Sequence, residues 1–295
     1  MLETFLAQVE RCSTVNLFNR LRISLEMILA PAEIALLAAQ VRERGAKLPE
    51  VAAAWLGRME TLMTGDGRPA EAYVRRTVTE GASWYAAPGT PAERAGRTIV
   101  FAYTGDANRL FMPAALFLQS CPADRYEFVV FYDFQHALFM KGIAGLAPDL
   151  PGSIERIAAI VGPSRYRHAM SFGTSAGGLA AVWTAVALGF DRAVSVGGVT
   201  PNEITSRVQT QGLSTDGFAE AIRRADGRLP DVLLVAGEDA GRDRRKALTM
   251  TGFLPATEIV VPGTANHNVL YDLWSRGELR PFLERVLAPP AVRRS

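Results

Sequence analysis

The decapeptide MSFGTSAGGL occupies positions 170–179 of the chain. It holds a G-x-S-x-G pattern, in which two glycines flank Ser175. The residues before the serine, 169–174, are typical of a short strand, and residues 176–188 have the spacing of a helix. Such a strand-to-helix turn strains the serine backbone and exposes its hydroxyl, while the glycines leave space for the tight crossing. Ser175 is therefore the candidate nucleophile.

The residue after the serine has a predicted role of its own. The amide of Ala176 stands at the start of the helix, where it points toward the place at which an oxyanion would develop. The alternative interpretation is a glycine-rich turn without chemistry. The other serines that follow a glycine by two positions, at 83, 164 and 214, lack the second glycine.

The chain around this motif alternates between strand and helix patterns. We expect strands at 98–104, 126–133, 169–174, 193–197, 232–236 and 258–261. We expect helices at 154–161, 176–188, 217–225, 243–250 and 269–286. Strands that alternate with such helices form right-handed crossovers, so we predict an α/β fold with a mostly parallel sheet and helices on both faces. A ligand would lie at the carboxyl ends of the strands.

The first part of the chain has a different texture. Apolar residues recur at helical spacing from 17 to 63, and residues 71–79 favour one more helix before the break at 86–91. We therefore predict two units, an N-terminal helical extension over 1–90 and a catalytic domain over 91–295.

Composition excludes several classes of protein. The 295 residues are 48% hydrophobic, which argues against disorder, and 32 Lys and Arg against 30 Asp and Glu argue against a nucleic-acid binder. Cys12 and Cys121 stand too far apart for a zinc ribbon or a disulfide scaffold. We expect no export signal, since an acidic residue and no apolar segment follow Met1, and charges and a proline interrupt the most apolar stretch, 23–39. We expect a cytoplasmic protein without an integral membrane segment. Residues 23–39 form either a buried helix pair or a peripheral membrane contact.

From about residue 95 to about residue 288, the chain resembles the α/β-hydrolase superfamily. The resemblance rests on the G-x-S-x-G-G elbow in its strand-to-helix context. It implies a nucleophile after the fifth strand and a triad in the chain order serine, acid, histidine. It also implies that the histidine lies in the loop between the last strand and the last helix.

The chain holds three histidines as candidates for the base. His168 stands at the start of the strand that carries Ser175, and His136 precedes the serine, against the order in the superfamily. His267 lies in PGTANHN, residues 262–268, which matches the expected loop. We therefore predict His267 as the base, and its alternative role is to cap the final helix.

Two aspartates follow the strand at 232–236. Asp239 resembles the acid of the superfamily, with one residue fewer after the preceding glycine, and is preferred. Asp243 is the alternative acid, although it also fits the N-cap of the next helix. Glu238 is the least favoured, since it would point to the other side of the strand end. The acid would hold His267 in the right tautomer.

The loop after the strand at 98–104 resembles the one that supplies the second oxyanion amide, here that of Asp106 or Ala107. The His-Gly-Gly-Gly sequence of lipase-type esterases is absent from it. Asn108 and Arg109 either contact a polar substrate or cap the following helix. Seven apolar residues are candidates for the pocket or for the core: Leu110, Phe111, Met112, Phe134, Leu138, Phe139 and Met140. Residues 200–230 leave room for one helix and no large lid.

The sequence thus predicts a serine hydrolase that cleaves an ester or thioester through an acyl-enzyme on Ser175. Its partner is a small acyl substrate, and no metal or organic cofactor is implied. The first alternative is an acyltransferase that uses the same triad with a sugar or alcohol acceptor. The second is a non-catalytic binding protein with the same fold. The N-terminal helices are expected either to cover the site or to form a homodimer surface.

Overall fold

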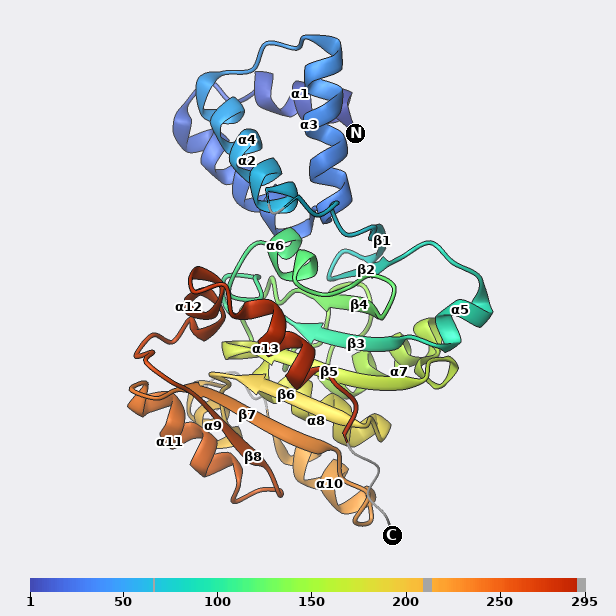
Figure 1. Ribbon diagram of the computed structural model, residues 1–295. Coiled ribbons are helices and arrows are strands. Elements are labelled where there is room, and N and C mark those ends of the chain that lie inside the picture. The colour runs from blue at the N-terminus through green and yellow to red at the C-terminus, as the bar shows by residue number, and fades with distance from the viewer. Residues whose placement is uncertain (66, 209–213, 291–295) are drawn as a thin grey trace.

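The computed structural model describes residues 1–65, 67–208 and 214–290. Its centre is an eight-stranded sheet with the order β1-β2-β4-β3-β5-β6-β7-β8 (Figure 1). The strands are β1 (Val74–Thr79), β2 (Ala82–Ala86), β3 (Thr98–Tyr103), β4 (Tyr126–Phe131), β5 (His168–Thr174), β6 (Arg192–Val196), β7 (Asp231–Gly237) and β8 (Thr257–Val261). From β4 through β8 neighbouring strands are parallel, while β2 is antiparallel to both of its neighbours. The predicted mostly parallel sheet is confirmed.

Helices cover both faces of this sheet and bury most of its central strands. All six residues of β3, TIVFAY, are buried. Val100 and Ala102 belong to the core on one face, and Ile99, Phe101 and Tyr103 to the core on the other. Successive side chains of a strand point to opposite faces, so a strand buried on both sides reads as a continuous apolar run.

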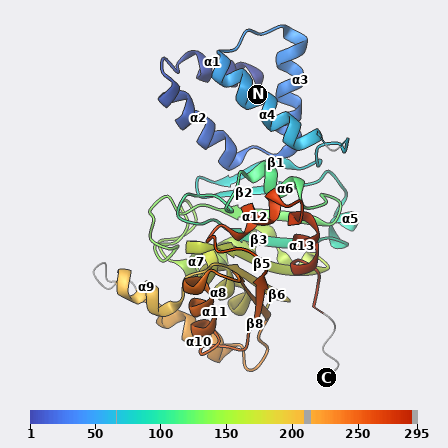
Figure 2. The ribbon, with the colours of Figure 1, turned by 60° about the vertical axis from the view of Figure 1, so that its left-hand side comes forward.

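Each face has its own set of helices. The first is packed by α6 (Ala114–Gln119), α12 (Val269–Ser275) and α13 (Leu279–Val286). The second is packed by α7 (Leu150–Val161), α8 (Gly178–Leu188), α10 (Asp216–Arg224) and α11 (Gly241–Met250). A short helix, α5 (Pro91–Ala95), precedes β3. Helices α9 (Pro201–Val208) and α10 lie at the end of the sheet opposite the N-terminal helices (Figure 2).

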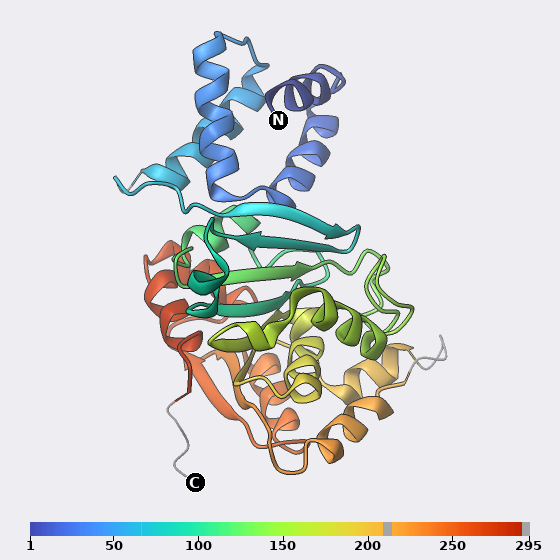
Figure 3. The same ribbon diagram turned by 90° about the vertical axis from the view of Figure 1, so that its right-hand side faces the viewer.

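The N-terminal extension consists of α1 (Leu2–Glu10), α2 (Val15–Ile28), α3 (Pro31–Arg44) and α4 (Glu50–Thr64). These helices stand beyond β1 and β2 at one end of the sheet (Figure 3). Trp55 packs against Phe5 and Phe18 within the extension. No helix in the described ranges is both long and apolar enough to span a bilayer. The cytoplasmic location and the homodimer remain predictions.

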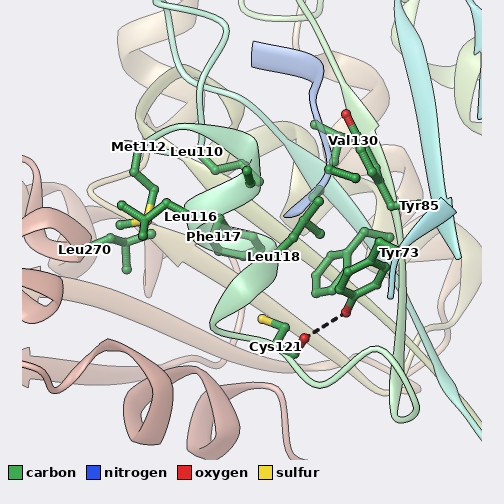
Figure 4. Packing of buried hydrophobic residues seen from close by; sticks show 14 of the residues in the cluster. Tyr73, Tyr85, Leu110, Met112, Leu116, Phe117, Leu118, Cys121, Val130 and Leu270 are labelled. Carbon is green, nitrogen blue, oxygen red and sulfur yellow. Dashed lines mark hydrogen bonds between the residues drawn. The ribbon is translucent and has the colours of Figure 1, made fainter. Parts of the chain in front are cut away.

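Helix α6 joins the extension to the sheet. Its side chains Leu116, Phe117 and Leu118 lie between the two parts and belong to one continuous core with them (Figure 4). At the edge of this core the Tyr73 hydroxyl donates to the carbonyl oxygen of Cys121 at 3.0 Å. Burial raises the pKa of Tyr73 well above its usual value. The extension is thus packed on the sheet through apolar contact.

Two predictions about the first unit are wrong. The helix predicted at 71–79 is strand β1, because VRRTVT is rich in β-branched residues and pairs with β2 across a tight turn. The extension helices end at Thr64, so β1 and β2, inside the predicted first unit, belong to the sheet.

Two differences concern the second unit. The single helix predicted at 269–286 is split into α12 and α13, because Gly277 takes a left-handed φ of 72° that ends the first of them. Within 200–230 the described residues form two helices, α9 and α10, rather than one. Residues 209–213 between them lie outside the described residues.

A buried carboxylate far from the carboxyl ends of the strands secures the sheet. Glu127 at the start of β4 is fully buried and accepts from Arg97 Nη1 at 3.0 Å, Trp84 Nε1 at 3.1 Å and the Tyr166 hydroxyl at 2.8 Å. A buried charge is stable only when paired and hydrogen-bonded in this way.

Removing this carboxylate should leave the buried Arg97 guanidinium without its counter-charge, with its hydrogen bonds to the carbonyl oxygens of Ala87 and Pro88 remaining. Glu127→Ala is expected to lower the free energy of unfolding by about 3–5 kcal/mol in urea denaturation. The matched control is Glu284→Ala, which removes exposed pairs with Arg125 and Arg280 and should cost less than about 1 kcal/mol. Equal losses in the two variants would contradict the prediction.

Candidate active site

Ser175 lies on the turn between β5 and α8 with a φ of 48°, in the left-handed region. A Cβ at Gly173 would stand 2.2 Å from the carbonyl oxygen of Gly177, and a Cβ at Gly177 would stand 2.5 Å from that of Tyr103. Neither position therefore accepts a larger residue. The turn is strained and closely packed, as the motif indicates.

Three side chains form a hydrogen-bonded chain at this turn. His267 Nε2 lies 2.9 Å from Ser175 Oγ, and His267 Nδ1 lies 2.7 Å from Asp243 Oδ2. An ionised carboxylate only accepts, so the neutral imidazole carries its proton on Nδ1 and accepts the serine proton at Nε2. Ser175 comes from the turn after β5, Asp243 from the first turn of α11 and His267 from the loop after β8. The structure thus brings the predicted serine and histidine together.

The preference for Asp239 as the partner of His267 is wrong in this geometry. Helix α11 begins at Gly241, earlier than predicted, so Asp243 falls in its first turn and is only 5% exposed. Asp239 is exposed, and its amide donates to the carbonyl oxygen of Thr264. The N-cap of α11 is Ala240, so the capping role considered for Asp243 is also wrong.

The other acid and the other histidines are engaged elsewhere or stand apart. Glu238 Oε2 accepts from the amide of Gly263 at 3.0 Å. His168, at the first position of β5, pairs with Asp191 at 3.2 Å. His136 is exposed in the loop after β4.

The environment of Asp243 favours its charged form. Burial opposes ionisation, but the hydrogen bond with His267, the electrostatic attraction of that imidazole and the nearby charge of Lys246 outweigh it, so the pKa of Asp243 lies below its usual value. Lys246 Nζ stands 3.6 Å from Asp243 Oδ1 and 3.5 Å from Glu203 Oε1. Sequence reasoning missed Lys246, although its position three residues after Asp243 puts both on one face of α11.

A cavity of about 780 Å³ opens over the serine. Its lining comes from the loops after β3, β6, β7 and β8, from α9 and α11 and from the β5 turn: Gly105, Asp106, Ala107, Arg109, Phe111, Ser175, Val199, Glu203, Asp239, Ala240, Gly241, Arg242, Asp243, Lys246, Ala265, His267 and Asn268. The cavity therefore sits at the carboxyl ends of the parallel strands, as expected for this kind of sheet. In the part of the chain that the structure describes, no group of three or more His, Cys, Asp and Glu side chains is arranged to hold a metal ion.

The loop after β3 lies against the nucleophile. A Cβ on Gly105 would be 3.3 Å from the Cβ of Ser175, and the next two residues, Asp106 and Ala107, are exposed on the cavity wall. Ala176 is buried in the turn behind the serine. Their roles as oxyanion donors stay predictions.

The two polar residues that follow differ in their surroundings. Asn108 is buried, takes a φ of 53° and accepts the amide proton of Asp133 at 2.8 Å, so its side chain holds the loop and is not among the cavity-lining residues. Arg109 lines the cavity, and its Nη2 lies 2.8 Å from Glu26 Oε2 in α2. Neither side chain caps a following helix, since the N-cap of α6 is Pro113.

Of the seven apolar candidates for the pocket, Phe111 lines the cavity. Its ring makes an edge contact with His267, with centroids 5.1 Å apart, and its φ of 64° is unusual for a bulky residue. Asn268 Nδ2 holds that backbone by donating to the Phe111 carbonyl oxygen at 2.8 Å. Phe134 is exposed, and the other five belong to the core: Leu110, Met112, Leu138, Phe139 and Met140.

Comparison with known proteins finds solved structures but no matching family model and no matching curated protein. An inhibited esterase B from Lactobacillus rhamnosis is 14% identical with a TM-score of 0.45, over 79% of this chain and 93% of its own. A siderophore hydrolase from Aspergillus nidulans is 13% identical with a TM-score of 0.49, over 76% and 98%. The capsule O-acetyltransferase of Neisseria meningitidis serogroup A is 11% identical with a TM-score of 0.48, over 74% and 97%.

The fold is identified by features of the chain itself. The sheet is mostly parallel, the G-x-S-x-G turn follows the fifth strand, and the hydrogen-bonded residues occur in the order serine, aspartate, histidine, the last of them after the final strand. This arrangement characterises the α/β-hydrolase superfamily, and the chain has the α/β-hydrolase fold.

Proposed function

We propose that the protein is a serine hydrolase that cleaves a small ester or thioester through an acyl-enzyme on Ser175. The observation that carries the proposal is the unbroken chain from Asp243 through His267 to Ser175, at 2.7 and 2.9 Å. A serine hydroxyl becomes a useful nucleophile when a base within this distance accepts its proton and a third group orients that base.

The reaction begins when Ser175 Oγ attacks the acyl carbon and its proton passes to His267 Nε2. Asp243 keeps the imidazole in the required tautomer and stabilises its protonated form. The amides of Ala176 and of Asp106 or Ala107 are the donors assigned to the oxyanion. The bond to the leaving oxygen or sulfur then breaks, and His267 returns the proton to that atom.

Deacylation repeats these steps with water. His267 takes a proton from the water, whose oxygen attacks the acyl carbon, and the bond to Ser175 Oγ breaks as the serine regains a proton. The carboxylic acid leaves, and the enzyme is restored. The reaction balances with the chain, the substrate and one water molecule.

An acyltransferase would share the first half of this sequence. The cavity of about 780 Å³ is much larger than a water molecule, so it has space for an acceptor. The charged side chains of Asp106, Asp239 and Arg242 line it, which favours a polar acceptor. Product analysis separates the two activities. Free acid released at a rate independent of added sugar or alcohol assigns hydrolysis, and an ester formed on the acceptor assigns transfer.

The nucleophile is tested with a fluorophosphonate probe. The wild-type protein should become labelled, and Ser175→Ala should abolish labelling because the attacking oxygen is gone. Ser164→Ala is the matched control, since Ser164 also follows a glycine by two positions but is exposed on a short turn before β5. Labelling retained in Ser175→Ala would refute the assignment.

The acid is tested by a pair of isosteric variants. Asp243→Asn should lower kcat by about 10³- to 10⁴-fold, because the amide no longer selects the tautomer or stabilises the imidazolium. Asp239→Asn, at the exposed cavity wall, should lower kcat by less than about tenfold. Steady-state kinetics on p-nitrophenyl acetate measure both, and the reverse ranking would reinstate Asp239.

The lowered pKa of Asp243 predicts a pH signature in stability. The folded state binds this proton less readily than the unfolded state, so the contribution is complete above the unfolded pKa of about 3.9 and is lost as the pH falls through the folded pKa. The wild-type protein should therefore lose more unfolding free energy than Asp243→Asn between about pH 6 and about pH 3. Urea denaturation at both pH values measures this, and parallel losses would contradict it.

A further inference from the structure

A carboxylate of the N-terminal extension reaches toward the catalytic domain. Glu26, in the last turn of α2, is 7% exposed. Its Oε1 accepts from Trp55 Nε1 at 3.0 Å and lies 3.7 Å from Arg22 Nε. Its Oε2 lies 2.8 Å from Nη2 of Arg109, a residue of the cavity wall. The carboxylate therefore joins the core of the extension to the loop over Ser175.

The backbone of Arg109 ties that loop to the nucleophile. Its carbonyl oxygen accepts from the amide of Gly105 at 2.9 Å and from the Thr174 hydroxyl at 3.3 Å. Gly105 packs on Ser175, and Thr174 is the residue before it. A shift of the Arg109 backbone would therefore disturb the contact of Gly105 with Ser175, the position of Thr174 and the amides of the same loop.

The end of α2 is itself held in place. The Tyr85 hydroxyl donates to the Ile28 carbonyl oxygen at 2.7 Å, and the Tyr132 hydroxyl donates to that of Met27 at 3.3 Å. Both tyrosines come from the sheet part of the chain, one from β2 and one from just after β4. The helix end that carries Glu26 is therefore fixed on the sheet, beside α6 (Figure 1).

We infer that Glu26 is a positioning residue for the reaction at Ser175: it fixes Arg109, and through Arg109 it fixes the oxyanion loop at residues 104–111. The inference rests on the proposed function of Ser175. If Glu26 has this role, the N-terminal extension contributes a residue that positions the active-site loop. The alternative explanation is that the ion pair between Glu26 and Arg109 only attaches the extension to the rest of the chain and has no effect on the reaction.

The chain offers a matched control for that alternative. Glu33 of α3 pairs with Arg75 of β1 at 3.1 Å, which also links the extension to the sheet. Neither residue lines the cavity. Glu33 also caps its own helix through the amide of Ala30, so Arg75→Met is the cleaner way to break this second link.

The experiment compares Glu26→Gln, Arg109→Met, the double variant and Arg75→Met with the wild-type chain. Glutamine keeps an acceptor for Trp55 but removes the charge, and Arg109→Met breaks the same pair from the catalytic side, so the test survives if one variant folds poorly. The readouts are the rate constant of fluorophosphonate labelling, kcat and KM for p-nitrophenyl acetate, and the free energy of unfolding.

We expect Glu26→Gln and Arg109→Met each to lower kcat and the labelling rate by about 10- to 100-fold, as for a misplaced catalytic group. In the Arg109→Met background, Glu26→Gln should have no further effect on kcat, because Glu26 acts through Arg109. Arg75→Met should lower stability and leave kcat within about twofold of the wild-type value.

Three results would overturn the inference. The first is a kcat unchanged by Glu26→Gln in a wild-type protein that is labelled normally, and this refutes the positioning role alone. The second is an equal loss of kcat in Arg75→Met, which shows general loosening. The third is an unlabelled wild-type protein, which refutes the proposed function together with the positioning role.

Discussion

Close packing between β5 and α8 determines where the reactive hydroxyl stands. A side chain at Gly173 or Gly177 would collide with backbone oxygens, so strand and helix meet at a separation that only glycine permits. The left-handed conformation of Ser175 costs about 1–3 kcal/mol in a residue with a Cβ. Residues Gly178 to Val186 of α8 are all buried, so both ends of the turn are held by core packing. The fold maintains the strain because relaxing it would disturb that core.

The same sheet brings distant parts of the chain to one place. His267 is 92 residues from Ser175 and 24 residues from Asp243, yet both hydrogen bonds are short. Parallel strands carry their following loops to the same edge, so the loops after β3, β5, β7 and β8 converge there. The meeting of these loops at one site depends on the order of the strands in the sheet. This explains how one short motif indicates the location of the whole cavity.

Much of the catalytic unit follows from the sequence because its signals are local. Residues 98–104 form a short, nearly continuous apolar run typical of a strand buried on both faces, and Ser175 carries a motif with its own structural context. The choice of acid depended on where α11 begins. A start at Gly241 turns Asp243 inward and leaves Asp239 exposed, and the sequence shows no strong cap at Ala240 to mark that start.

Other features were beyond local patterns for related reasons. Residues 74–79 have few apolar side chains, because β1 is an edge strand with no fully buried residue, so its pairing with β2 decides its form. The left-handed φ of Phe111 comes from tertiary contacts with Asn268 and His267. No spacing rule anticipates a bulky residue in that conformation. The link from Glu26 to Arg109 spans 83 residues and two structural units.

That link is difficult to explain by stability alone. Replacing a buried ion pair by apolar side chains of similar volume is often neutral or stabilising, since the desolvation of two charges offsets their attraction. The extension already shares an apolar core with α6 and one face of the sheet. Tyr85 and Tyr132 add hydrogen bonds to the helix end without burying a charge. The charged pair adds a fixed orientation of the Arg109 side chain beside the cavity. A loop that takes part in catalysis must hold its groups in a defined orientation.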